Sequence, residues 1–289
     1  NFRIEEGQTL GVLGPNGCGK TTTIGMLLGL IKPSSGKILV NEENFENLNR
    51  ENILSKFNFA SPYVELPKKL TVKENLEIYG RLYGVKNLTG RIQQISNDLN
   101  LGFFLNKKTG ELSSGQKNRV SLAKSLINNP KILFLDEPTS GVDIQLRKEM
   151  WDMILQLKQS GVTVILTTHY IKEAETIADR IGIIDKGELI LVENKENLIN
   201  KFGKKSIIIE FGEKIYEIPD KIKDFDCFIT DDNLCLVIKK LKNNKDINIT
   251  NVIKIISKLK IPVIDIKTEE SSLEDIFLDI ISERAKGEL

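Results

Sequence analysis

The sequence has few of the residues from which metal sites and disulfide frameworks are built. In 289 residues it contains 3 cysteines, Cys18, Cys227 and Cys235, and a single histidine, His169. An odd number of cysteines without C-x-x-C spacing disfavours a disulfide framework or a zinc site and is typical of a reducing compartment. One histidine cannot supply a multi-histidine metal centre.

The sequence also lacks long hydrophobic runs and an excess of either charge. Its longest apolar stretches, such as 162–166, have strand length, well short of the roughly 18 to 20 residues that span a bilayer. With 41 Lys and Arg against 40 Asp and Glu, the net charge is +1. Charge alone therefore does not favour a nucleic-acid partner. The composition, 40% hydrophobic and 28% charged, is typical of a globular protein.

The order of apolar segments predicts two domains, 1–200 and 201–289. In the first, strands of buried type alternate with helical patterns, which is typical of an α/β fold around a mainly parallel sheet. In the second, short strands joined by polar turns, with helices, predict a small α+β domain. The expected strands are 8–13, 131–135, 162–167 and 181–184, followed by 206–211, 214–218, 233–238 and 263–266, with a helix at 252–259.

Capping boxes mark the starts of three predicted helices. The signal is a Ser or Thr followed three residues later by Glu or Gln, and it occurs at Thr71, Ser113 and Ser271. The first of these helices should reach about residue 82 and the second should stop near residue 130. A further helix is expected at 22–30, closed by Pro33 and Gly36.

A glycine-rich loop follows the first predicted strand. Gly14-x-x-x-x-Gly19-Lys20-Thr21 has P-loop spacing between a strand and a helix. Such a loop turns backbone N–H groups and a helix N-terminus toward phosphate, while the lysine supplies positive charge and the threonine hydroxyl reaches magnesium. A Gly-rich turn without a ligand is the alternative. The predicted nucleotide-binding residues are Gly14, Pro15, Asn16, Gly17, Cys18, Gly19, Lys20, Thr21 and Thr22.

Two adjacent carboxylates end the strand predicted at 131–135. Beside a P-loop, Asp136 can hold magnesium and Glu137 can accept a proton from an attacking water. Two acids at a strand end can also simply begin a loop, but their place behind a P-loop favours the chemical interpretation. Thr21 and Asp136 are therefore the predicted metal ligands, and Glu137 and Lys20 are predicted catalytic residues.

The order of the motifs resembles one family. After the P-loop come Leu112-Ser113-Ser114-Gly115-Gln116, then Asp136-Glu137-Pro138-Thr139-Ser140-Gly141-Val142-Asp143, then Thr167-Thr168-His169. Over residues 1 to about 200 this set resembles the ATP-binding cassette (ABC) ATPases. The resemblance implies a P-loop NTPase-type sheet with a helical signature subdomain. It also implies ATP and Mg²⁺ as cofactors.

The resemblance implies further site residues. The family works as a head-to-tail dimer, in which Ser113 and Gly115, with Gln116 beside them, would grip the γ-phosphate of ATP on the opposite protomer. Asp143 matches the aspartate that crosses the dimer interface. His169 matches the switch histidine that contacts the γ-phosphate and is counted as catalytic. A purely structural imidazole is the alternative for His169.

Two features depart from the family pattern. The glutamine usual between the P-loop and the signature is absent, and Ser61 or Pro62 stands at its place. Ser61 can still bind water near the metal. The family's N-terminal strand and adenine-stacking aromatic would lie before residue 1, so we expect the chain to begin inside the nucleotide-binding domain.

Cys18 lies inside the predicted phosphate loop. The helix N-terminus is expected to favour its thiolate, although we prefer the interpretation that a small residue simply fits there. We also expect bound ATP to slow the alkylation of Cys18.

Two segments resemble the exporter ATPases of ABC-2 type, namely 66–76 and 272–278. This resemblance implies an ATP-hydrolysing motor subunit of a multi-chain transporter, cytoplasmic and peripheral on the membrane. Its partners would be a separate polytopic permease subunit and a second ATPase protomer, in the simplest case an identical chain. A regulatory cassette without turnover and a non-transport ABC ATPase are the alternatives.

Overall fold

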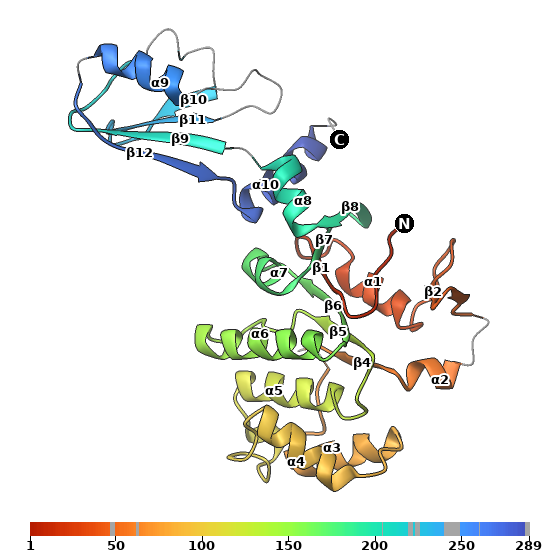
Figure 1. Cartoon of the computed structure of the whole chain (residues 1–289). Coiled ribbons are helices and arrows are strands. Elements are labelled where there is room, and N and C mark those ends of the chain that lie inside the picture. The colour runs from red at the N-terminus through yellow and green to blue at the C-terminus, as the bar shows by residue number, and fades with distance from the viewer. Residues whose placement is uncertain are drawn as a thin grey trace. The chain divides into compact units, whose positions relative to one another are not determined.

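The chain divides into two compact units, Asn1–Lys195 and Glu196–Leu289 (Figure 1). The computed structural model of the protein describes residues 1–46, 50–61, 64–203, 205–218, 222, 226–239, 249–259 and 261–286.

The first unit is built on a six-stranded sheet of order β4-β5-β6-β1-β7-β8. Neighbouring strands are parallel except β7 and β8, which are antiparallel, so the predicted mainly parallel sheet is confirmed. The strands are β1 (Thr9–Leu13), β4 (Phe57–Ala60), β5 (Ile132–Asp136), β6 (Thr163–Thr168), β7 (Arg180–Asp185) and β8 (Glu188–Asn194), and a separate pair joins β2 (Leu39–Val40) to β3 (Glu43–Asn44).

Helices cover both faces of this sheet, which is why its central strands are apolar along their length. In β5, Leu133 and Leu135 join the core that contains helix α5, whereas Phe134 joins the core that contains Ile24 of α1. Helices α3 and α4 pack together, and α3 also packs against α5 (Figure 1). The helices are α1 (Lys20–Leu27), α2 (Arg50–Leu54), α3 (Val72–Leu82), α4 (Leu88–Asp98), α5 (Ser114–Ser125), α6 (Ile144–Gln159) and α7 (Ile171–Ile177), with a 3-10 turn at Thr109–Glu111.

The second unit contains an antiparallel sheet of order β10-β11-β9-β12. Val252 and Ile256 of α9 share a core with Ile207 and Ile209 of β9 and Leu236 of β11. The elements are α8 (Lys195–Phe202), β9 (Lys205–Phe211), β10 (Asp226–Ile229), β11 (Cys235–Lys239), α9 (Ile249–Ile256), a 3-10 turn at Ser257–Leu259, β12 (Val263–Glu270) and α10 (Leu273–Ala285). In the part of the chain that is described, no helix has the length and apolar character needed to cross a membrane.

Hydrogen bonds at the helix starts confirm two of the three capping boxes. Thr71 and Ser113 each accept a hydrogen bond from the residue three positions on, whose side chain accepts one in return. The box predicted at Ser271 is wrong by one residue, since Ser272 caps α10. There the Asp275 carboxylate accepts hydrogen bonds from the N–H and the hydroxyl of Ser272, at 2.9 and 2.7 Å.

The first helix ends earlier than predicted. Instead of running to residue 30, α1 stops at Leu27, and Gly29 follows with a left-handed φ of +69°. The Leu30 N–H then bonds back to the Gly25 carbonyl at 2.9 Å. This is the Schellman arrangement, so a local glycine ends the helix before Pro33 is reached.

One predicted strand of the second unit is wrong. Residues 214–218 are irregular, although the Ile215 N–H bonds the Asn233 carbonyl at 2.8 Å. The strand beside β11 at this edge is β10, which the sequence pattern did not predict. Ile215 is buried in the core of this unit, and Ile218 packs against it. Packing into that core accounts for the apolar residues of 214–218, so their pattern does not require a strand.

A buried lysine joins the helical part of the first unit to its sheet. Lys124 of α5 is 8% exposed, and its Nζ donates to the Phe59 carbonyl of β4 at 2.9 Å. The ammonium also lies 5.4 Å from the ring centroid of Tyr79 in α3. Burial lowers the pKa of Lys124 to about 8, because the charged form loses hydration.

Replacing this lysine should change how stability depends on pH. Below pH 8 the buried charge destabilises the fold, and this penalty disappears as pH rises toward 10.5, the value for an unperturbed lysine. Over that range the unfolded chain holds the proton more tightly than the folded one. The stability of the wild type relative to Lys124→Met should therefore rise by about 3 kcal/mol between neutral pH and about pH 10.5.

Urea unfolding over this pH range measures the difference. The matched control is Lys117→Met, because Lys117 is an exposed lysine of the same helix. Its stability difference from the wild type should stay flat. A flat difference for Lys124→Met as well would contradict the lowered pKa.

Candidate functional site

The loops that carry the predicted site lie at one edge of the first sheet. Strand β6 lies between β1 and β5 and is parallel to both, so the carboxyl ends of the three strands meet. Gly14 follows β1, Glu137 follows β5 and His169 follows β6. In open α/β sheets, ligands bind at this edge.

The loop after β1 has a conformation that glycine permits. Gly19, directly before α1, has a φ of +105°. A Cβ at Gly14 would lie 2.4 Å from the Ile184 carbonyl oxygen and 2.5 Å from Cys18 Sγ, so no larger residue fits without a shift. The exposed members of the predicted nucleotide-binding set are Pro15, Asn16, Gly17, Thr21 and Thr22. The tip of the loop is therefore exposed to solvent, while its base is buried and closely packed.

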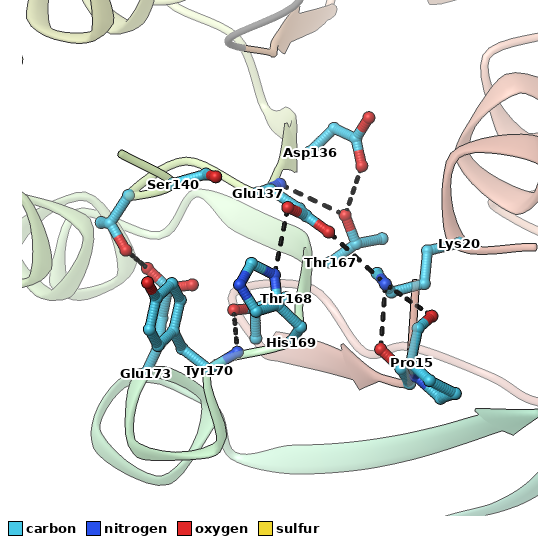
Figure 2. A network of polar contacts seen from close by, with 12 residues as sticks. Pro15, Lys20, Asp136, Glu137, Ser140, Thr167, Thr168, His169, Tyr170 and Glu173 are labelled. Atoms are coloured by element: carbon cyan, nitrogen blue, oxygen red, sulfur yellow. Dashed lines mark hydrogen bonds and ion pairs between the residues drawn. The ribbon is translucent and has the colours of Figure 1, made fainter. Parts of the chain in front are cut away.

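Lys20 lies at the centre of the site. Its Nζ donates to the carbonyls of Gly14 and Pro15, at 2.9 and 3.0 Å, and lies 3.4 Å from Glu137 Oε1 (Figure 2). Lys20 is 5% exposed and Glu137 8%, so water screens their attraction poorly. The ammonium is thus held in place where it can bind an anionic ligand.

Glu137 stands between Lys20 and His169. Its Oε2 lies 3.1 Å from His169 Nδ1 (Figure 2). Its N–H donates to the Thr167 carbonyl at 2.9 Å. The φ of Glu137 is +48°, a left-handed conformation that is uncommon for any residue other than glycine. A carboxylate held in this way can orient a water molecule and accept its proton.

Asp136 joins hydroxyl groups from two other elements. Its Oδ2 accepts a hydrogen bond from Thr21 Oγ1 at 3.0 Å, and its Oδ1 accepts one from Thr167 Oγ1 at 2.5 Å. A carboxylate and a hydroxyl oxygen side by side are hard ligands of the kind that Mg²⁺ takes, with its other positions filled by phosphate oxygens and water. The predicted metal ligands Thr21 and Asp136 therefore fit that ion.

The other predicted residues line a separate cleft. Ser113 and Gln116 bond each other at the start of α5, and Asp143 caps α6 by accepting the Leu146 N–H at 3.0 Å. The cleft has a volume of about 380 Å³, and its lining is Phe104, Ser113, Ser114, Gly115, Gln116, Arg119, Gly141, Asp143 and Leu146. The structure thus forms two groups, one around Lys20 and one at the N-terminus of α5.

Ser61 emerges from the sheet beside the metal-ligand candidates. It follows β4, whose register pairs Ala60 with Leu135, the residue before Asp136. Ser61 is buried at 4% exposure, and its carbonyl accepts the Val64 N–H. Pro62, the other residue predicted at this place, lies outside the described residues.

Thr167 is a further site residue that the sequence motifs did not predict. The β5–β6 register pairs Thr167 with Asp136, and this pairing brings its hydroxyl to the carboxylate. The only signal in the sequence was a polar residue near the end of a strand, two residues before His169. Glu173, buried in α7, was also missed.

The buried position of Cys18 agrees with the preferred interpretation that a small residue fits there, and the alternative of a stabilised thiolate is wrong. Cys18 is 4% exposed, and burial raises the pKa of its thiol more than the Lys20 charge and the backbone N–H groups lower it. A Cβ at Gly14 would lie only 2.5 Å from Cys18 Sγ. The Cys18 side chain is therefore packed against Gly14 inside the loop.

Known proteins resemble the chain in sequence and in fold. A family model described as ABC transporter matches residues 1–140. The Nod factor export ATP-binding protein I of Burkholderia lata is 34% identical over 227 residues, which cover 78% of this chain and 74% of the relative. ABC transporter A family member 8 of Arabidopsis thaliana is 32% identical over 97% of this chain, but the chain spans only 32% of that relative.

A solved structure shares the fold. It is a dimeric ATP-binding cassette in a post-hydrolysis state, bound to ADP and Pi. It matches with a TM-score of 0.62 and 28% identity, over 67% of this chain and 88% of the other.

Iodoacetamide should alkylate Cys18 slowly in the native chain. Because the thiol is buried and its pKa is raised, little thiolate forms at neutral pH, and the rate should climb only at higher pH than in the denatured chain. Peptide mapping by mass spectrometry gives the rate at each pH, with the half-buried Cys227 and Cys235 as internal references. Rapid labelling of Cys18 at neutral pH would count against this environment.

Proposed function

The chain belongs to the ATP-binding cassette (ABC) transporter family, and from this premise we propose that it is the ATP-hydrolysing motor subunit of a multi-chain exporter of ABC-2 type. One observation carries the ATPase proposal. Glu137 contacts both Lys20 and His169, and the pair Thr21 and Asp136 lies at the same edge of the sheet.

The exporter class rests on the relatives. The Burkholderia relative is named for Nod factor export, and segments 66–76 and 272–278 resemble ATPases of ABC-2 type. In such a transporter, a separate polytopic permease subunit would conduct the cargo. The present chain would lie at the cytoplasmic face of the membrane and close as a dimer around ATP.

The residues of the first loop would bind and orient the nucleotide. The backbone N–H groups of 14–19, which Pro15 lacks, and the N-terminus of α1 would face the phosphates, and Lys20 would exchange its carbonyl partners for terminal phosphate oxygens. Thr21 and Asp136 would hold Mg²⁺. When bound, that ion neutralises charge on the β- and γ-phosphate oxygens.

Glu137 would orient the water that attacks the γ-phosphorus and take its proton, as the bond to the leaving ADP oxygen breaks. His169 lies 3.1 Å from Glu137 Oε2; it would hold this carboxylate and face the γ-phosphate. A second copy would add Ser113, Gly115 and Gln116 from its α5, with Asp143 at the interface. The site would then be complete only in the dimer.

A regulatory cassette that binds ATP without turnover is the second candidate. The observation that favours it is Ser61, which stands beside Asp136 where the family places a glutamine. The contacts of Glu137 with the buried Lys20 and with His169 favour turnover. Phosphate release by the wild-type chain decides between the two.

Glu137→Gln should abolish most turnover and leave binding intact. Because the amide cannot accept the proton of water, the rate of phosphate release should fall by about 100-fold or more, while the Kd for ATP changes little. Glu111→Gln, at an exposed glutamate, is the matched control. Equal rates in Glu137→Gln and the wild type would remove Glu137 from this role.

MgATP should drive Glu137→Gln into a dimer. Without turnover the closed state persists, so size-exclusion chromatography should show an ATP-dependent shift to twice the mass. Glu137→Gln combined with Lys20→Ala should stay monomeric, since the phosphates lose their lysine. A monomer that demonstrably binds ATP would contradict self-pairing of this chain.

A further inference from the structure

A fully buried carboxyl group lies behind the site and has none of the roles described above. Glu173 of α7 is 0% exposed. Its Oε1 accepts two hydrogen bonds, from Thr139 Oγ1 at 2.7 Å and from Trp151 Nε1 at 3.0 Å. Burying a carboxyl group is unfavourable, so a group with such defined partners specifies one arrangement of the elements that it joins.

Its partners belong to the segments that carry the site. Thr139 is itself fully buried and lies two residues after Glu137, in the turn between β5 and α6. The Ser140 N–H closes this turn by donating to the Glu137 carbonyl at 3.1 Å. Glu173 lies in α7, which begins two residues after His169. The carboxyl group therefore connects the turn that presents Glu137 to the helix that follows His169 (Figure 2).

Contacts of Tyr170 strengthen the same connection. The Arg147 guanidinium of α6 lies 4.2 Å from the centroid of the Tyr170 ring and donates to the Val142 carbonyl at 3.1 Å. The Tyr170 ring in turn lies 4.4 Å from that of His169. The first turn of α6 and the start of α7 thus hold the loop that carries the histidine.

Burial raises the pKa of the Glu173 carboxyl group, against the opposing effects of its donors Thr168, Thr139 and Trp151 and of the Arg147 charge. Thr168 directly precedes His169. The Glu173 carboxyl group is therefore surrounded by residues from both the loop that carries Glu137 and the loop that carries His169. The contact that these loops must preserve is the 3.1 Å approach of Glu137 Oε2 to His169 Nδ1. Small displacements of such pairs lower rates strongly.

We propose that Glu173 is a positioning residue for ATP hydrolysis, which holds the turn carrying Glu137 at a fixed distance from His169 through its hydrogen bond with Thr139. The proposal rests on the proposed ATPase function. Glu173 does not contact the nucleotide, so its loss should lower kcat and leave the Kd for ATP unchanged.

The test compares the two donors of Glu173. Thr139→Val removes the bond to the Glu137 turn at nearly constant shape, whereas Trp151→Phe removes the bond to α6 and leaves that turn attached. We expect kcat to fall about tenfold or more in Thr139→Val and only slightly in Trp151→Phe, with the Kd for ATP unchanged in both. Glu173→Gln, which keeps an acceptor oxygen, should retain most of the wild-type rate.

The single histidine supplies a readout that does not depend on turnover. NMR of the imidazole reports only His169, because the chain has no other histidine. Thr139→Val should shift its ring signals in the direction seen for Glu137→Gln, whereas Trp151→Phe should leave them in place. If Glu173 only stabilised the fold, the His169 signals would not distinguish Thr139→Val from Trp151→Phe.

Two results would overturn the proposal. One is an unchanged kcat with unchanged imidazole signals in Thr139→Val. The other is an equal fall of kcat in both donor variants, in step with an equal loss of thermal stability. If the wild-type chain released no phosphate, the ATPase proposal would fail, and the imidazole signals would still test whether Glu173 positions the pair.

Discussion

The parallel pairing of β6 with two neighbours is the constraint on which the site depends. Thr167 is in register with Val12 of β1 on one side and with Asp136 of β5 on the other. This register aligns the ends of the three strands, so that the phosphate loop, the two carboxylates and the histidine begin at the same level. A slip of one residue would turn these side chains to the opposite faces of the sheet.

The aligned strand ends bring charges together in a poorly hydrated place. Lys20, Asp136 and Glu137 are all at least nine-tenths buried, and charged groups are tolerated there only when they are paired and hydrogen-bonded. Each has its partners: loop carbonyls for the lysine, two hydroxyls for Asp136, and an ammonium and an imidazole for Glu137. These contacts hold the groups close to the place where a phosphate ligand would bind.

Behind these groups lies a further layer of buried polar contacts. The turn after Glu137 is bound to Glu173, and the loop of His169 is packed against Tyr170 and Arg147. Lys124 makes a comparable connection between α5 and β4. In both places a buried, hydrogen-bonded polar side chain joins elements that are far apart in sequence, which fixes their relative position more sharply than apolar packing alone.

Local signals were sufficient to find the phosphate loop, two capping boxes and the paired carboxylates, because each depends on residues next to one another. They failed where two local options competed, as at Gly29, which ends α1, and at Ser272, which caps α10 in place of its neighbour. Strand order, register and burial join distant residues, so only the tertiary structure placed Thr167 on Asp136, put Glu173 behind His169 and raised the pKa of Cys18. The sequence by itself therefore determined which chemical groups the site contains. The tertiary structure decided how they meet, because the pairing of distant strands sets the distances between them.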